Sequence, residues 1–284
     1  MHYLAAVLSS FSSSVTSIFG KLLFTIGASV SQILFIRFFI SFLISFLVFI
    51  FIKKKFNFRN FVIFGILGIL NYGIAAYLFF FGLQFLNPAY ATVLFFTNPV
   101  FVLLFQKIFY KDKIGTFNWI AIVTSILGVF FANLGEQSLE KDDEIIIGTL
   151  IIIAAAIINA LFITVTGKKL KNLTSNVFEN VFYTFFGVTL YYLLITSFTK
   201  ELSTIKFEYV SYGLLLSIFS TFIPLTLSFF SLKKLKSQTV AIIMPLEIVF
   251  ASVLSLLIFG ETFNLLKILG FILISTAPIL ENFK

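Results

Sequence analysis

The chain has no cysteine and a single histidine, His2, among its 284 residues. The absence of cysteine excludes disulfide bonds, thiolate metal sites and cysteine nucleophiles. Because the one histidine lies next to the N-terminus, we expect neither a histidine-based catalytic triad nor a metal site built from several histidines. No GxxxxGK[ST] phosphate-binding loop occurs, which argues against ATP hydrolysis by this chain. These absences predict a protein that is not an enzyme and that carries no cofactor.

Charged residues are also scarce. They make up 11% of the chain, whereas hydrophobic residues make up 60% and the mean hydropathy is +1.08. Soluble domains contain about 25% charged residues, and no polar stretch here is long enough to fold outside a bilayer. The net charge of +8 does not indicate a nucleic acid as partner, because in a membrane protein the distribution of charge among the connections matters more. The composition therefore predicts an integral membrane protein surrounded by the lipid bilayer.

Breaks in the apolar runs divide the chain into ten segments, each close to the roughly 20 apolar residues that an α-helix needs to cross a bilayer. Their length and the lack of period-2 alternation favour helices over strands. No basic region precedes the first segment, so we expect it to stay in the mature chain rather than be cleaved as a signal peptide. The predicted fold is an all-α membrane protein with ten transmembrane helices, near residues 3–24, 31–52, 60–81, 88–108, 115–134, 145–166, 177–198, 208–230, 237–258 and 263–282.

Most of the 20 lysine and arginine residues fall in alternate connections between these segments. The basic connections lie near residues 53–59, 107–113, 168–171 and 233–236. By the positive-inside rule these connections face the cytoplasm, so both termini are expected there, in a bacterial inner membrane. The acidic connection 136–144 is then expected on the periplasmic side.

The two halves of the chain resemble each other. A shift of 149 residues aligns residues 81–112 with residues 230–261 without a gap. The matched pairs include Leu83 with Leu232, Leu86 with Leu235, Val100 with Val249, and Phe101 with Phe250. Small residues follow in both copies, Ala121 and Gly128 in the first and Gly270 and Ala277 in the second, and such residues let membrane helices pack closely.

This repetition predicts the domain organisation. We expect a five-helix repeat over residues 1–135, a connecting loop over residues 136–144, and a second five-helix repeat over residues 145–284. Because five is an odd number of spans, the second repeat must be inverted relative to the first. Inverted repeats related by a pseudo-twofold axis in the membrane plane are typical of transporters, whose substrate site lies near the bilayer midplane.

Short motifs in both copies resemble those of the EamA branch of the drug/metabolite transporter superfamily, over essentially the whole chain. They are Asn98-Pro99-Val100, Tyr110-Lys111-Asp112 and Gly128 in the first copy, and Leu246-Glu247-Ile248-Val249, Phe259-Gly260-Glu261 and Gly270 in the second. Two departures are Ile248, where the family pattern has proline, and Asp112, where it has glutamate. The resemblance implies a secondary transporter that exports small organic metabolites, amino acids or related compounds, by alternating access. The alternatives are a flippase of lipid-linked substrates on the same fold and, less favoured, an integral membrane enzyme; the sequence does not define an oligomeric state.

Two polar residues lie at matching places in the repeats. Asn98 and Glu247 are each the eleventh residue of their predicted spans, so both are expected near the middle of the bilayer. An ionised carboxylate there costs about 2.5–3.5 kcal/mol on insertion scales, so we expect Glu247 to face the bundle interior. It either hydrogen-bonds a neighbouring helix or takes part in substrate binding or proton coupling.

Other polar residues within the predicted spans are candidates for the same site. Arg37 lies early in the second span, where it either extends to the headgroups or contacts an anion. Asn71, Tyr72, Asn159 and Tyr183 either line a cavity or join helices through hydrogen bonds. Three prolines, Pro99, Pro224 and Pro245, are expected to interrupt helical hydrogen bonding in their spans.

Overall fold

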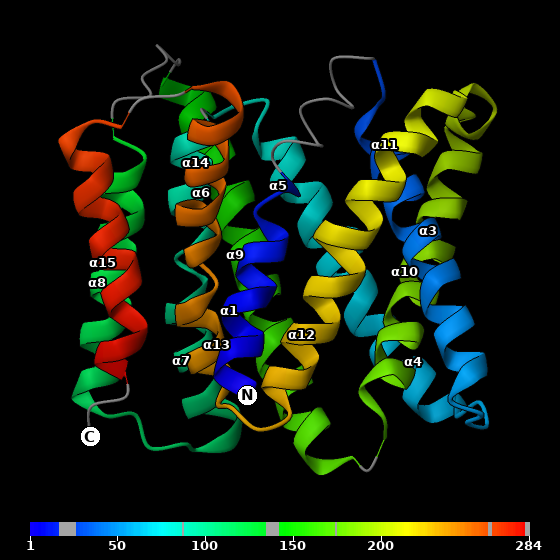
Figure 1. The fold of residues 1–284 in the computed structure, drawn as a ribbon, viewed down its shortest axis with the longest axis horizontal. Helices are drawn as coiled ribbons and strands as arrows, with labels where there is room; N and C mark the ends of the chain where they lie inside the picture. The colour runs from blue at the N-terminus through cyan, green and yellow to red at the C-terminus, as the bar shows by residue number, and fades with distance from the viewer. Residues whose placement is uncertain (17–26, 87, 135–141, 174, 261–262, 282–284) are drawn as a thin grey trace.

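The structure is a computed structural model that describes residues 1–284 except 17–26, 87, 135–141, 174, 261–262 and 282–284. The regular structure of the described residues is helical, in a bundle whose long helices run roughly side by side (Figure 1). The elements of the first half are α1 (His2–Ser13), α3 (Val30–Phe51), α4 (Phe58–Gly68), η1 (Ile69–Ala75), α5 (Ala76–Gly82), α6 (Pro88–Phe95), α7 (Asn98–Tyr110) and α8 (Thr116–Ala132). Those of the second half are α9 (Asp142–Asn172), α10 (Val177–Phe198), η2 (Glu201–Thr204), α11 (Phe207–Ser217), η3 (Ile218–Phe222), α12 (Ile223–Leu232), α13 (Ser237–Ile243), α14 (Leu246–Phe259) and α15 (Leu265–Glu281).

Within the described residues, 7 continuous helical stretches are long and apolar enough to cross a membrane. They are Val30–Phe51, Phe58–Gly82, Tyr90–Tyr110, Ile145–Asn172, Val177–Phe198, Phe207–Leu232 and Ser237–Ile258. Helices α1, α8 and α15 occupy the other three predicted positions, with 12, 17 and 17 residues. The fold is therefore that of an all-α, multi-pass membrane protein, and the full set of ten crossings stays a prediction.

The ends of the helices sort onto two faces of the bundle. Helix α1 begins and α15 ends at the same end, and the connections that follow α3, α7, α9 and α12 lie at that end too (Figure 1). These are the basic connections of the sequence. Helices α3 and α7 are followed by Lys53 and Lys111 in the left-handed conformation, with φ of 49° and 54°. Both lysines place their charge beyond the end of an apolar helix, where it can reach water. The acidic connection expected at residues 136–144 lies largely outside the described residues.

Element bounds in the two halves recur with the same shift of 149 residues. Helix α4 begins at Phe58 and α11 at Phe207, and the π-helical segments η1 and η3 begin at Ile69 and Ile218. Helices α8 and α15 match at both ends under this shift. Lys111, with φ 54°, corresponds to Gly260, with φ 69°, so even the left-handed residue after α7 and α14 recurs. The similarity that the sequence shows over residues 81–112 and 230–261 thus extends to the backbone.

Two predicted spans are each broken in the middle. Turns at residues 96–97 separate α6 from α7, and turns at residues 244–245 separate α13 from α14. Hydrogen bonds between residues three apart replace the helical pattern there, from the Val100 nitrogen to the Thr97 oxygen at 3.0 Å and from the Glu247 nitrogen to the Met244 oxygen at 3.0 Å. Prolines without an N–H group explain both breaks. The predicted interruptions by Pro99 and Pro245 are confirmed, and Pro224 is the second residue of α12, which follows η3.

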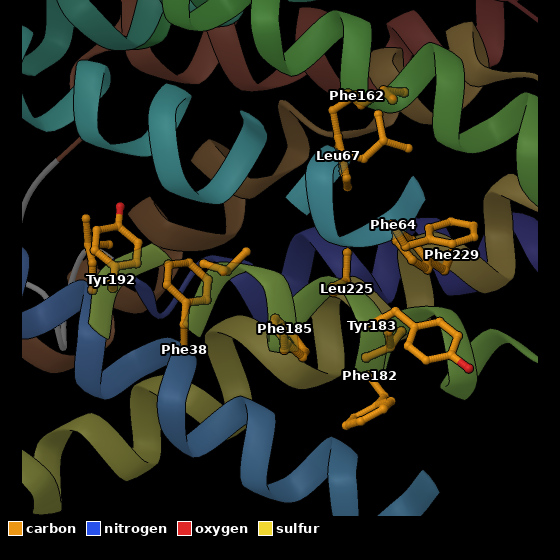
Figure 2. Close-up of a cluster of buried hydrophobic side chains, with 14 of the residues drawn as sticks. Phe38, Phe64, Leu67, Phe162, Phe182, Tyr183, Phe185, Tyr192, Leu225 and Phe229 are labelled. Carbon is orange, nitrogen blue, oxygen red and sulfur yellow. The ribbon is translucent and has the colours of Figure 1, made fainter. Parts of the chain in front are cut away.

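The main hydrophobic core lies between α3, α4, α9, α10 and α12 and is rich in aromatic residues (Figure 2). The rings of Phe38 and Tyr192 stack with centroids 5.8 Å apart, and Phe38 also packs on Tyr72 at 5.5 Å. Phe229 lies against Phe64 at 5.9 Å. Aromatic pairs at such distances contribute about 0.5–1.5 kcal/mol each beyond their buried area. This core fixes the position of η1, which carries candidate site residues.

Helices α8 and α15 form a separate close pair at one side of the bundle (Figure 1). A Cβ atom added at Gly270 would lie 2.4 Å from the Ala132 nitrogen and 2.6 Å from the Gly128 oxygen. Ala121 and Ala277 in the same pair are fully buried. The predicted role of these small residues in close helix packing is confirmed, because no larger side chain fits between the two backbones.

One predicted boundary is clearly wrong. The span expected at residues 145–166 is part of α9, which runs over 31 residues, Asp142–Asn172. The apolar run stops at Gly167, but the following Lys168-Lys169-Leu170-Lys171 consists of residues that favour the helical state. A hydrophobic run predicts the part of a helix that lies within lipid, and the helix itself can extend beyond that part.

Candidate functional site

Three asparagine side chains from three helices meet inside the bundle. The Asn98 Nδ2 donates to the Asn159 Oδ1 at 2.5 Å, and the Asn159 Nδ2 donates to the Asn71 Oδ1 at 2.9 Å. All three residues are buried, on α7, α9 and η1. We call this chain of side chains the amide ladder. It joins three predicted spans, so Asn71 and Asn159 form hydrogen bonds between helices, one of the two alternatives expected for them, and Asn98 joins them.

The amide ladder ends in an acceptor without a partner. The Oδ1 atom of Asn98 is buried and has no hydrogen bond among the described residues. Asn98 is the first residue of α7, directly after the break at residues 96–97. At its other end, the ladder continues to Tyr72, whose hydroxyl group interacts with the Asn71 side chain.

A tyrosine hydroxyl hydrogen-bonds the backbone of segment η1. A π-helical segment leaves carbonyl groups without the usual partner four residues ahead, and such segments are frequent at functional sites. The Tyr192 hydroxyl lies 3.0 Å from the Tyr72 oxygen and 3.0 Å from the Gly73 oxygen. Tyr192 is fully buried on α10. It therefore satisfies the backbone of the segment that positions Asn71 and Tyr72.

Arg37 plays the corresponding part for η3. Its Nε donates to the Thr221 Oγ1 at 2.6 Å, and its Nη2 donates to the Ser220 oxygen at 2.8 Å and to the Ser220 Oγ at 3.3 Å. The guanidinium group thus hydrogen-bonds η3 from a different helix. Arg37 remains partly exposed, and its Nη1 has no hydrogen bond among the described residues. A fork with unused N–H groups suits a carboxylate or phosphate.

Glu247 lies in the first turn of α14, directly after the break at residues 244–245. Its backbone nitrogen donates to the Met244 oxygen, but its carboxylate has no hydrogen bond among the described residues. The carboxylate and the Arg37 guanidinium attract each other electrostatically, although no ion pair within 4.0 Å joins them. Tyr72 lies near both groups. The structure therefore brings Arg37, Tyr72 and Glu247 into one region of the bundle interior.

The two halves of the site differ in chemistry at equivalent positions. Under the shift of 149 residues, Asn98 corresponds to Glu247, and Asn159 corresponds to Ser10. Asn159 on α9 accepts a hydrogen bond from Asn98, whereas the Ser10 side chain on α1 donates to the Ile243 oxygen at 3.2 Å. Asn98 is therefore paired with the other half of the chain, whereas the Glu247 carboxylate has no hydrogen bond among the described residues.

Tyr183 lies apart from these groups. Its side chain is fully buried in the aromatic core (Figure 2), and its hydroxyl accepts a hydrogen bond of 2.7 Å from the Asn57 nitrogen. Asn57 is the N-cap of α4, so Tyr183 fixes the connection between α3 and α4. The sequence placed Tyr183 with the other candidates because it is a polar residue within a predicted span. Position in the sequence does not show whether the hydroxyl group of such a residue lies in the site or contacts a connection between helices.

Three residues of this region were not among the sequence candidates: Tyr192, Ser220 and Thr221. A signal for two of them was available, because the shift of 149 residues places Ser220 on Asn71 and Thr221 on Tyr72. Nothing in the sequence singles out Tyr192 from the nine other tyrosines, since its role depends on the π-helical segment opposite. The described residues contain no group of three or more histidine, cysteine, aspartate or glutamate side chains that could hold a metal ion.

Comparisons with known proteins identify relatives of the whole chain. A model of the EamA-like transporter family matches residues 1–134 and again residues 146–280. An "Uncharacterized transporter" of Clostridium kluyveri is 24% identical over 216 residues, which cover 75% of this chain and 70% of the relative. The "Uncharacterized transporter YoaV" of Bacillus subtilis is 27% identical over 105 residues, which cover 37% of this chain and 34% of that protein.

A solved crystal structure shares the fold. It superposes with a TM-score of 0.81 at 13% sequence identity, and the match covers 99% of this chain and 96% of the other. The family match covers nearly the whole chain in two copies, and the apolar helices are those of a membrane protein. The chain therefore belongs to the EamA-like transporter family of the drug/metabolite transporter superfamily, as a multi-pass membrane transporter.

Proposed function

We propose that this protein is a secondary transporter that exports small organic metabolites, amino acids or related compounds, by alternating access between two inverted five-helix repeats. The repeats comprise residues 1–135 and 145–284. Family membership supports the general function, and the recurrence of element bounds with a shift of 149 residues supports the two repeats. Both repeats contain one π-helical segment and one broken span, so their moving parts are built alike.

The observation that carries this proposal is the unpaired charge inside the bundle. Arg37 and Glu247 are both partly exposed and lie within long apolar stretches, yet no ion pair joins them. Ionisable residues at such positions are costly, and in membrane proteins they mark substrate and ion pathways. The broken spans that carry Asn98 and Glu247 fit the discontinuous helices around which transporters of inverted-repeat design bind substrates.

Glu247 is the residue we propose as the carrier of a coupling proton. A carboxyl group that gains a proton on one side of the membrane and loses it on the other can link proton movement to alternating access. Asn98 occupies the equivalent position in the first repeat but has no ionisable group, so the two repeats are not equivalent in this respect. Of these two equivalent positions, only the one in the second repeat can therefore carry a proton.

We place the protein in the bacterial inner membrane with both termini in the cytoplasm. The end of the bundle where α1 begins and α15 ends also carries the basic connections (Figure 1), and such connections stay in the cytoplasm.

Transport in liposomes tests the function. Purified protein is reconstituted in liposomes that contain one unlabelled amino acid at high concentration, and uptake of the same labelled amino acid is measured by exchange. Over a panel of amino acids, a transporter of this class exchanges at least one solute faster than empty liposomes do. Scrambling of a fluorescent lipid in the same liposomes, without exchange of any solute, would instead assign the flippase activity.

A further inference from the structure

We infer that Arg37 and Glu247 are the two poles of one substrate site, and that the substrate is a zwitterion with an anionic group at Arg37 and a cationic group at Glu247. This inference rests on the proposed function and adds to it the residues that select the substrate. The oppositely charged side chains come from α3 and α14, which lie far apart in the sequence. They interact electrostatically but form no ion pair within 4.0 Å.

The first step of the argument concerns Arg37. Its guanidinium group is fixed from one side by Thr221 and Ser220, through Nε and Nη2. These bonds hold the plane of the group and leave Nη1 without a hydrogen bond among the described residues. An arginine oriented in this way is prepared for a planar anion, because less conformational entropy is lost when the anion binds. A carboxylate matches the spacing of the guanidinium N–H groups.

The second step concerns Glu247. Its counterpart in the first repeat, Asn98, is part of the amide ladder, whereas the Glu247 carboxylate has no hydrogen bond among the described residues. Arg37 and Tyr72 lie near this carboxylate. An ammonium group can donate hydrogen bonds to a carboxylate in such surroundings and balance its charge.

The third step joins the two poles. A ligand with one charge would satisfy one residue and leave the other charge inside the bundle without a counter-charge from the ligand, which is costly where the dielectric constant is low. A zwitterion satisfies both and adds no net charge to the interior. Neutral polar groups of the first repeat lie beside this pair, since Tyr72 interacts with Arg37 and with Asn71. The charged groups of the site therefore belong to Arg37 and Glu247 among the described residues.

The test compares ligands and variants in one binding assay. The panel of amino acids is screened by the thermal stability of the purified protein, because a ligand that binds the folded state stabilises it. For the amino acid that binds, we compare three probes: the amino acid itself, its N-acetyl derivative without the ammonium group, and its carboxamide without the carboxylate. We expect each derivative to bind the unmodified protein about tenfold more weakly or worse, since each loses one charge-assisted interaction.

Substitutions then assign each pole. In Glu247→Gln the amino acid should lose its preference over the N-acetyl derivative but keep its preference over the carboxamide, and in Arg37→Gln the reverse should hold. Arg37→Lys keeps the charge and should retain part of the carboxylate preference, which a purely structural role in holding η3 would not produce. Two exposed residues, Arg59 and Glu208, provide matched controls, as Arg59→Gln and Glu208→Gln should leave both preferences unchanged.

The outcomes separate this inference from the proposed function. If both derivatives bind and exchange as well as the amino acid does, the zwitterion site is wrong and the transporter stands. If a singly charged solute is exchanged and no zwitterion is, the inference is also wrong. If no solute is exchanged at all, the proposed function fails first. The ligand comparison on the unmodified protein decides the matter even if a variant does not fold.

Discussion

The amide ladder permits a quantitative prediction, because its central residue makes both hydrogen bonds. Replacement of Asn159 by leucine, a side chain of similar volume, removes the bonds to Asn98 and Asn71 and leaves both partners buried. Hydrogen bonds between membrane helices contribute about 0.6 kcal/mol on average and about 1.7 kcal/mol at most. An unpaired buried group adds a cost of about 1–3 kcal/mol. For two bonds and two abandoned partners, we expect Asn159→Leu to lower the free energy of unfolding by about 2–4 kcal/mol.

The measurement is unfolding by sodium dodecyl sulfate in mixed micelles, followed by the loss of far-ultraviolet circular dichroism. Asn133→Leu is the matched control, because within the described part of the chain the Asn133 side chain bonds the Val129 oxygen of the helix that it follows, at 2.7 Å, and no other helix. It should cost less than about 1 kcal/mol. Asn71→Leu is then added to Asn159→Leu, and the double variant should lose about 0.5–3 kcal/mol less than the sum of the single variants. If Asn159→Leu is no less stable than the control, or if the two changes add, the ladder does not hold the three helices together.

Three further predictions concern packing, coupling and topology. A Cβ atom at Gly270 would lie 2.4 Å from a backbone nitrogen of α8, so Gly270→Ala should lower the free energy of unfolding by about 1–3 kcal/mol. Gly65→Ala should be tolerated, because a Cβ atom at Gly65 would have no neighbouring atom closer than 3.6 Å. Equal losses of stability in the two variants would contradict the packing argument. Glu247→Gln should fold and still exchange substrate, but should not accumulate it under an imposed pH gradient in liposomes; normal accumulation would rule Glu247 out as the proton carrier. A cysteine in place of the exposed Ser203, in η2, should react with a membrane-impermeant thiol reagent in intact cells. A cysteine in place of the exposed Lys54 should react only after the cells are lysed. The opposite pattern of labelling would invert the proposed orientation.

Much of the architecture is predictable from the sequence, because the membrane restricts the choices. Apolar runs, their spacing and the distribution of lysine place the helices, and the shift of 149 residues relates the two halves before any coordinates are known. The breaks after Phe95 and Ile243 follow from nearby prolines. The close approach of α8 and α15 follows from small residues at matching places. These features depend on local chemistry, which a single sequence records.

The site is predictable only in part, because its parts come from different helices. Asn71, Asn98 and Asn159 are recognisable as polar residues within apolar spans, but their connection into one ladder requires the positions of η1, α7 and α9 relative to one another. The sequence does not predict the π-helical geometry of Ile69–Ala75 and Ile218–Phe222, although each segment contains a polar pair at the same place. Their stability depends on Tyr192 and Arg37, which lie on other helices. The sequence therefore identifies site residues whose polarity is unusual and misses those whose partners are distant.

The comparison of the two halves explains why polar groups at equivalent positions serve different purposes. Asn98 and Asn159, which come from different halves, hydrogen-bond each other, and Asn159 also bonds Asn71, so these bonds contribute to holding helices together. At the equivalent place, Ser10 donates to the Ile243 oxygen, and the Glu247 carboxylate has no hydrogen bond among the described residues. A buried polar group that is already paired gains little from a ligand, whereas an unpaired one gains most of a charge-assisted hydrogen bond. Selection of substrates should therefore depend on Arg37 and Glu247, and substitutions in the amide ladder should change stability more than they change which solute is bound.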